Sequence, residues 1–291
     1  MTSAAEMRSA VLAAQRDGET IGFVPTMGAL HAGHLSLVEA SLAACDRTVV
    51  SIFVNPTQFG ADEDLLCYPR LLEQDVQRLE QLGCWLVFAP STAEMYPLGS
   101  ETLVDVGPVA MPLEGVARPD HFRGVATVVL KLFQIVPADR AFFGQKDYQQ
   151  TLVVRQMVRD LTVPIEIQVC PTIREADGLA MSSRNAYLTS PERQRALSLW
   201  QALQLAAKLH AAGENEVAAL RTSMQMHFAS VKGFSCRAGI DVQYIAFLDS
   251  GTVQPVTTIT GPTVIAIAAR VGKTRLIDNC LIGTSMGNII G

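Results

Sequence analysis

The chain has 291 residues, of which 49% are hydrophobic and 18% charged, a balance typical of a compact globular protein with a large core. Its formal net charge of -5, without a cluster of lysine and arginine, argues against a nucleic-acid partner. The length favours about two domains.

The 6 cysteines are widely spaced and mostly embedded in apolar runs, which favours buried free thiols over a disulfide framework. They are Cys45, Cys67, Cys84, Cys170, Cys236 and Cys280. Residues 1–18 have helical periodicity with charges throughout and no apolar signal core. The longest apolar runs fall well short of the ~20 residues that a membrane span needs. We therefore expect a soluble cytoplasmic protein without a membrane partner.

Residues 3–16 have the spacing of an amphipathic helix, and residues 21–24 form a short apolar run typical of a buried strand. A second helix is expected from Leu35 to about Cys45. The segment between this strand and helix contains three turn-forming residues and two histidines, namely Pro25, Gly28, Gly33, His31 and His34.

A strand that ends in a glycine-containing turn and opens a helix points backbone N–H groups at a ligand, and the helix dipole adds positive potential. This pattern predicts a phosphate site. His31 and His34 are close enough in sequence to act on one ligand. Two other interpretations stay open. The histidines are a metal pair, although the further ligands that zinc needs are scattered, or they cap the helix and have no chemical role.

Residues 47–54 form a nearly continuous β-rich run, as expected for a parallel strand buried on both faces. The run ends in a turn at Asn55–Gly60. Polar residues at the carboxyl end of a buried strand lie where open α/β sheets bind ligands.

Strands alternate with helices over the following residues. Helices are expected at 71–82, 125–136 and 149–161, and strands at 84–89, 140–143 and 165–169. Residues 91–123 are rich in proline and glycine, and we expect an irregular flap or interface segment there. The alternation predicts an α/β fold with a doubly wound parallel sheet.

The pattern changes after Arg174. Ser190 and Pro191 predict a helix start, with Ser190 as the cap. Two helices run to about residue 211 and from 215 to 231, and strands follow at 241–248 and 263–271. Helices followed by strands indicate a second, smaller α+β domain. We therefore expect a first domain at 1–173 and a second at 174–291.

Four polar stretches lie where strands end or where the two domains meet. They are the histidine segment, Asn55–Gln58, Gly144–Gln150 and Met181–Arg184. Each stretch alone is compatible with an ordinary turn or a solvated helix end. Together they suit nucleotidyl transfer, which needs donors and positive charge around phosphates.

Lys146 and Arg184 supply the charge, and Ser182–Ser183 supply hydroxyl groups. Gln58 and Gln150 are neutral, which suits the orientation of a carboxylate or hydroxyl group. The Val271-Gly-Lys-Thr274 stretch is similar to the end of a phosphate-binding P-loop, but Ile267 stands where that motif requires glycine. We interpret Lys273 and Arg275 as structural or interface charges.

Several motifs, in order, resemble the pantothenate synthetase (pantoate–β-alanine ligase) family of the His-x-Gly-His nucleotidyltransferase superfamily. They are Val24-Pro-Thr-Met-Gly-Ala-Leu-His-Ala-Gly-His34, Ser51-Ile-Phe-Val-Asn-Pro-Thr-Gln-Phe59, His121-Phe-Arg-Gly124, Phe143-Gly-Gln-Lys-Asp-Tyr-Gln-Gln150, Met181-Ser-Ser-Arg-Asn185 and Arg275-Leu-Ile-Asp-Asn279. The Asn-Pro-Thr-Gln-Phe and Asp-Tyr-Gln-Gln stretches are the most specific.

The resemblance implies ATP-dependent condensation of pantoate with β-alanine through a pantoyl adenylate, with release of AMP and pyrophosphate. It also implies a Rossmann-like first domain, a second domain that closes as a lid, a Mg²⁺ requirement and a homodimer. Two alternatives are another adenylyltransferase of the superfamily and a nucleotide-binding regulatory module without turnover.

The resemblance also implies roles for individual residues. His34 is the expected proton donor, with His31, Lys146 and Arg184 as further catalytic groups. The expected ATP-binding residues are Met27, Gly28, Ala29, Leu30, His31, Ala32, Gly33, His34, Gly144, Gln145, Lys146, Asp147, Ile173, Met181, Ser182, Ser183 and Arg184. The expected substrate-binding residues are Gln58, Gln150 and Asn55.

Asp75 lies where the family places a magnesium-linked carboxylate, although the helix pattern alone predicts a solvated side chain there. Its neighbour Gln74 is acidic in some relatives. Two further positions depart from the family pattern. Gln145 replaces a usual Glu beside Lys146, and Asp120 replaces a frequent Gly, where its negative charge is expected to weaken anion binding.

Overall fold

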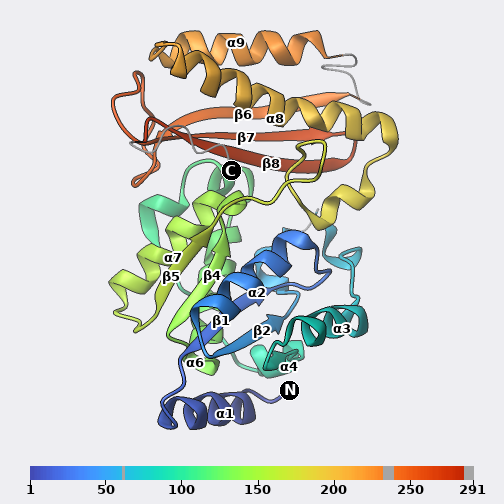
Figure 1. The fold of residues 1–291 in the computed structure, drawn as a ribbon, viewed down its shortest axis with the longest axis vertical. Coiled ribbons are helices and arrows are strands. Elements are labelled where there is room, and N and C mark those ends of the chain that lie inside the picture. The colour runs from blue at the N-terminus through green and yellow to red at the C-terminus, as the bar shows by residue number, and fades with distance from the viewer. Residues whose placement is uncertain (61–62, 232–238, 285–291) are drawn as a thin grey trace. The chain divides into compact units, whose positions relative to one another are not determined.

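The computed structural model describes residues 1–60, 63–231 and 239–284 (Figure 1). Cys236 lies outside these ranges. The chain divides into two compact units, unit 1 with Met1–Gln145 and Gln149–Cys170 and unit 2 with Lys146–Tyr148 and Pro171–Gly291. In the described part of the chain, no helix is both long enough and apolar enough to cross a membrane.

Unit 1 contains a five-stranded parallel sheet with the strand order β3-β2-β1-β4-β5. The strands are β1 (Ile21–Thr26), β2 (Arg47–Ile52), β3 (Leu86–Phe88), β4 (Arg140–Gly144) and β5 (Glu166–Cys170). The order reverses between β1 and β4, and the carboxyl ends of two such strands form the usual ligand site of this architecture. The predicted Rossmann-like, doubly wound sheet is confirmed.

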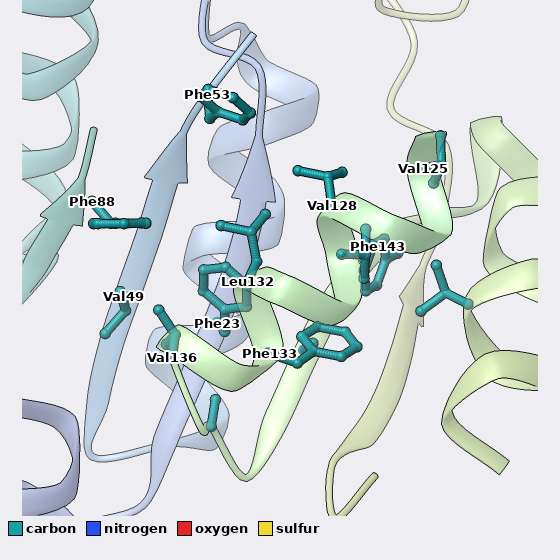
Figure 2. Close-up of a cluster of buried hydrophobic side chains, with 14 of the residues drawn as sticks. Phe23, Val49, Phe53, Phe88, Val125, Val128, Leu132, Phe133, Val136 and Phe143 are labelled. Carbon is teal, nitrogen blue, oxygen red and sulfur yellow. The ribbon is translucent and has the colours of Figure 1, made fainter. Parts of the chain in front are cut away.

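Helices cover both faces of this sheet because alternate strand residues point to opposite sides. The helices of unit 1 include α1 (Ala4–Arg16), α2 (Ala32–Ala44), α3 (Leu72–Leu82), α6 (His121–Ile135) and all but the first residue of α7 (Tyr148–Asp160). On one face, Phe23, Val49 and Phe143 pack with residues of α1, α6 and α7. Figure 2 shows these three side chains beside those of α6. On the other face, Val24 and Phe142 pack with α2 and α3.

The segment predicted to be irregular, residues 91–123, contains three short helices, α4 (Thr92–Met95), η3 (Gly107–Ala110) and α5 (Glu114–Ala117). The start predicted for the next helix, near residue 125, is wrong, because α6 begins at His121. Phe122 and Val125, three positions apart on this helix, are both buried in the core of unit 1. Packing therefore extends the helix into a stretch whose glycines and prolines favour a loop.

Unit 2 contains an antiparallel sheet with the order β6-β7-β8, formed by β6 (Ile240–Asp249), β7 (Thr263–Val271) and β8 (Thr274–Ile282). Two helices, α8 (Ser190–Ala211) and α9 (Val217–Ser230), pack with this sheet around one apolar core (Figure 1). The α+β architecture is confirmed. The sequence pattern does not predict β8, because Arg275, Asp278 and Asn279 interrupt the apolar run.

Two local details of unit 2 bear on the sequence motifs. Gly272 and Lys273 form the turn between β7 and β8, with a left-handed φ of +58° at Gly272. The Gly-Lys-Thr stretch is therefore a hairpin turn and not a phosphate-binding loop. The predicted cap at Ser190 is wrong, because Thr189 is the N-cap of α8 and shares a reciprocal capping box with Glu192.

Candidate functional site

The His loop, residues 27–34, follows the carboxyl end of β1 and includes the first three residues of α2. His31 is the N-cap of α2, and its backbone N–H donates to Nδ1 of His34 at 3.4 Å. The two rings are stacked, with their centroids 4.0 Å apart. Because Nδ1 of His34 accepts this bond, a neutral His34 carries its proton on Nε2 and can donate it from there. The helix-cap and proton-donor interpretations are therefore compatible.

A buried carboxylate fixes the backbone of the His loop. Asp75 on α3 is 1% exposed, so the solvated side chain predicted for it is wrong. Its Oδ2 accepts the N–H of Ala29 and its Oδ1 accepts the N–H of Leu30, each at 2.8 Å. These two loop N–H groups thus point at Asp75 and not at a ligand. Coordination of magnesium by Asp75 stays a prediction, and it would disturb these bonds.

The polar turn after β2 lies beside the His loop. Asn55, which is 1% exposed, precedes the short helix η1 (Pro56–Gln58). Its Nδ2 donates to Oε1 of Gln58 at 3.0 Å, and Nε2 of Gln58 donates to the sulfur of Met27 at 3.3 Å. The structure thus brings together three residues that the sequence assigned to two separate stretches.

A hydrogen-bond network that the sequence pattern does not predict holds the backbone of Gln58. The backbone carbonyl of Gln58 accepts from Nδ1 of His121 at 2.9 Å and from Arg118 at 3.2 Å. A second Arg118 nitrogen lies 3.1 Å from Nε2 of His121, and the guanidinium also pairs with Glu63 at 2.5 Å. Because a guanidinium only donates, Nε2 of His121 accepts and Nδ1 carries the proton.

Burial, followed by the charge of Arg118, lowers the pKa of His121 to about 4, so that its ring is neutral at pH 7. The nearby Gly124 packs closely against the same turn, since a Cβ atom there would lie 2.3 Å from the Thr57 carbonyl oxygen. The His121-Phe-Arg-Gly124 motif marked this place in the sequence. Its spacing gave no sign that it supports the turn that carries Gln58.

The two glutamines at the start of α7 differ in their surroundings. Gln149 is 5% exposed, and its side chain bonds to the backbone of Val109, Pro112 and Glu114. It therefore holds the segment before α6. Gln150, the predicted pantoate contact, is half-buried.

Of the other predicted ATP residues after β4, all except Gln145 belong to unit 2. Nζ of Lys146 lies 3.7 Å from a carboxylate oxygen of Asp147. The carbonyl of Ile173 accepts the N–H of Met181 at 2.9 Å. Ser182 precedes the short helix η5 (Ser183–Tyr187), and its hydroxyl oxygen accepts the N–H of Arg184 at 3.3 Å. Gln145, which is 7% exposed, is the last residue of the first segment of unit 1.

Comparison with known proteins gives consistent matches along the chain. The family model for pantoate-beta-alanine ligase matches residues 1–281. A pantothenate synthetase from Roseiflexus sp. (strain RS-1) is 51% identical over 288 residues, which cover 97% of this chain and 98% of the relative. A pantothenate synthetase from Moorella thermoacetica is 51% identical, over 96% of each protein.

Solved structures give the same result. The pantothenate synthetase of Thermus thermophilus superposes with a TM-score of 0.89 at 44% identity, covering 96% of this chain and 97% of that one. A pantoate-beta-alanine ligase from Francisella tularensis, solved in complex with Beta-gamma ATP and β-alanine, superposes with a TM-score of 0.76 at 36% identity. The second match covers 96% of this chain and 95% of the other.

Proposed function

The chain belongs to the pantoate-beta-alanine ligase family, and we propose that it condenses pantoate with β-alanine in an ATP-dependent reaction through an enzyme-bound pantoyl adenylate. The observation that carries this proposal is the similarity to pantothenate synthetases over nearly the whole chain, at 51% identity. The relative that was solved with a form of ATP and with β-alanine supports the choice of substrates.

In the first step, a carboxylate oxygen of pantoate attacks the α-phosphorus of ATP. The bond from that phosphorus to the bridging oxygen breaks, and pyrophosphate leaves. Negative charge develops on the phosphate oxygens, and donors placed there stabilise the transition state. We assign this role to His31 and to Nε2 of His34, with charge from Lys146 and Arg184. The tautomer of His34 supports its assignment as the donor.

In the second step, the amine of β-alanine attacks the activated acyl carbon. The bond from this carbon to the phosphate oxygen breaks, AMP leaves, and the new amide nitrogen loses a proton. We assign the orientation of pantoate to Gln58 and Gln150, and that of β-alanine to Gln58. The contact from Gln58 to the Met27 sulfur supports this role, because a thioether is a weak acceptor that a substrate oxygen would readily replace.

We assign to Asn55 the role of holding the Gln58 amide, in addition to any contact with substrate. The support is its own burial and its bond to Oε1 of Gln58. The backbone of Ile173, the remaining residues of the His loop and Ser182–Ser183 complete the proposed ATP site. Closure of the second domain as a lid belongs to the same proposal.

Magnesium is the expected companion of ATP, and it would neutralise phosphate charge when bound. Enzymes usually hold Mg²⁺ through phosphates, water and one or two carboxylates, without an all-protein cage. Among the described residues, no group of three or more His, Cys, Asp or Glu side chains is placed to hold a metal ion. Asp75 already accepts two backbone N–H groups, and this supports an ion that arrives with ATP and is held mainly by its phosphates.

We also propose a homodimer and a cytoplasmic location. Four large apolar side chains between residues 98 and 116 support the dimer, because they are well exposed in the single chain. They are Leu98 at 108% exposure, Leu103 at 57%, Met111 at 68% and Val116 at 75%.

The test of the reaction is to mix the purified protein with ATP, MgCl₂, pantoate and β-alanine. AMP and pantothenate are expected in equal amounts, and neither is expected when pantoate is omitted. A stable adenylated product without pantothenate would favour another adenylyltransferase. The absence of AMP in every mixture would contradict the ligase function. The nucleotide-binding regulatory module would then be the remaining alternative.

A further inference from the structure

Strand β8 carries two adjacent buried polar residues, Asp278 and Asn279, which are 3% and 2% exposed. Neighbouring strand residues point to opposite faces of a sheet. Asp278 shares its face with Leu276 and Cys280, which belong to the apolar core of unit 2. Asn279 therefore points away from this core. Buried polar groups need hydrogen-bond partners. The partner of each side chain therefore shows what packs against that face of β8.

The carboxylate of Asp278 pairs with Arg174, which lies far from it in the sequence. The guanidinium makes two bonds to the carboxylate, at 2.7 and 3.0 Å, and lies over the ring of Trp200, 3.7 Å from its centroid. Burial raises the pKa of Asp278, and the bonds from Arg174 oppose this rise. A paired, stacked guanidinium has little freedom to move. Arg174 is thus fixed against β8.

The partner of Asn279 is the backbone of Lys146. Nδ2 of Asn279 donates to the Lys146 carbonyl at 2.8 Å. Oδ1 of Asp278 in turn accepts the backbone N–H of Asn279 at 2.8 Å. The carboxylate held by Arg174 therefore also fixes the backbone from which the Asn279 amide extends to Lys146.

Arg174 lies near the start of a short hairpin, residues 173–181. Its guanidinium donates to the Gly178 carbonyl at 3.2 Å, and its backbone pairs with Ala180 in an antiparallel bridge. The amide of Asn185 donates to the Ala180 carbonyl at 3.0 Å. The hairpin is thus tied both to β8 and to the short helix η5, which contains Arg184.

We propose that Arg174, Asp278 and Asn279 are positioning residues, which hold Lys146 and the 173–181 hairpin in one arrangement for adenylate formation. The inference rests on the function proposed above. Three segments of unit 2 that belong to the proposed ATP site, at Lys146, Ile173 and Ser182–Arg184, are joined through two neighbouring residues of β8. Catalysis by positioned charge is sensitive to small displacements, so loosening Asn279 from Lys146 slows the first step.

The test uses Asn279→Ala and Asn279→Asp in the full chain, with exchange of labelled pyrophosphate into ATP in the presence of pantoate as the readout. We expect the kcat of exchange to fall about ten- to hundredfold in both variants, with little change in the KM for pantoate. Reaction of β-alanine with supplied pantoyl adenylate should change much less. The Asp substitution keeps the side-chain volume, so it provides the result if the Ala variant does not fold.

A double-mutant cycle with Lys146→Ala separates positioning from general support of the fold. If Asn279 acts through Lys146, Asn279→Ala causes no further loss of exchange in the Lys146→Ala background. Losses that multiply would overturn the inference, and so would exchange at the parent rate in both single variants.

Ser198→Ala is the matched control, because Ser198 is 1% exposed and donates to the Arg195 carbonyl at 2.6 Å in the same unit. It should keep the parent rate, and an equal loss in this variant would also overturn the inference. If the parent chain itself shows no exchange, the proposed function fails, which is a different outcome from a parent-like Asn279 variant.

Discussion

The carboxylate of Asp75 accepts the backbone N–H of Ala29 at 2.8 Å, and Ala29 has a left-handed φ of +53°. An alanine in this conformation costs roughly 1–2 kcal/mol. A bond from an N–H to a buried carboxylate is strong enough to offset much of this cost. The preceding residue, Gly28, is also left-handed, at +83°. Asp75 therefore keeps the His loop in a shape that its own sequence does not favour.

We expect Asp75→Asn to lower both stability and turnover. An amide has only one oxygen, so its NH₂ group would face one of the two loop N–H donors. The unpaired donor should cost about 1–3 kcal/mol of unfolding free energy, measured by urea denaturation. Displacement of the histidines should lower the kcat of AMP formation at least about tenfold.

Asp139→Asn is the matched control for Asp75. Oδ2 of Asp139 accepts the N–H of Ile21 at 2.7 Å, at the end of β1 opposite to the His loop. This variant should lose some stability and keep its kcat. The same fall in kcat for both variants would show that Asp75 has no particular effect on the His loop.

His121 should make stability depend on pH. Its pKa is about 4 in the folded chain, against 6.5 for the ordinary side chain. Between these values the unfolded chain binds more protons, so stability falls as the pH falls from about 6.5 to about 4. The difference of about 2.5 pKa units corresponds to roughly 3 kcal/mol.

The measurement for His121 is urea denaturation at pH 7 and pH 4.5, on the parent chain and on His121→Asn. The asparagine amide can still donate from near the position of Nδ1, but it does not titrate. The parent should lose its advantage over the variant at the lower pH. An equal pH dependence of the two chains would argue against a neutral His121 in the fold.

Lys146→Ala should abolish most adenylate formation. A donor at the phosphates is worth about 3–4 kcal/mol in the transition state, so pyrophosphate exchange should fall by at least about two orders of magnitude. Lys208→Ala, which removes an exposed lysine from α8 in the same unit, should have no effect. Parent-like turnover of Lys146→Ala would remove Lys146 from the site.

Asp120→Gly should stabilise the chain by up to about 1 kcal/mol. Asp120 has a left-handed φ of +66°, a conformation that glycine adopts without steric cost. Its ion pair with Arg123, at 2.8 Å, is exposed and contributes little. The control is Asp105→Gly, because Asp105 pairs with the same arginine at 3.0 Å. Urea denaturation should show a gain for the first variant only.

Met111→Glu should weaken the proposed homodimer, since it adds a charge to the exposed apolar residues between 98 and 116. Light scattering across a range of concentrations is expected to give more monomer than for the parent. Leu66→Glu is the control, because Leu66 is 95% exposed and lies outside the 98–116 segment in sequence. A parent that is monomeric at every concentration would contradict the dimer.

The sequence by itself determined the class of fold, most of its elements and the family. Periodicity predicts α1 and α8 because each helix buries one face, and a continuous apolar run predicts β2 because that strand is buried on both faces. The motifs predict the family because their residues stand in fixed order near strand ends. None of these inferences requires knowledge of which distant residues meet.

Only the tertiary structure decided what the polar residues touch. Asp75 reads as a solvated helix residue until α3 places it against Ala29, 46 positions away in sequence. His121 likewise gains its partner Gln58 across 63 positions, and Asn279 gains Lys146 across 133. Whether a carboxylate, an imidazole or an amide is solvated, supports a loop or holds a catalytic group depends on such long-range packing, which local sequence pattern does not encode.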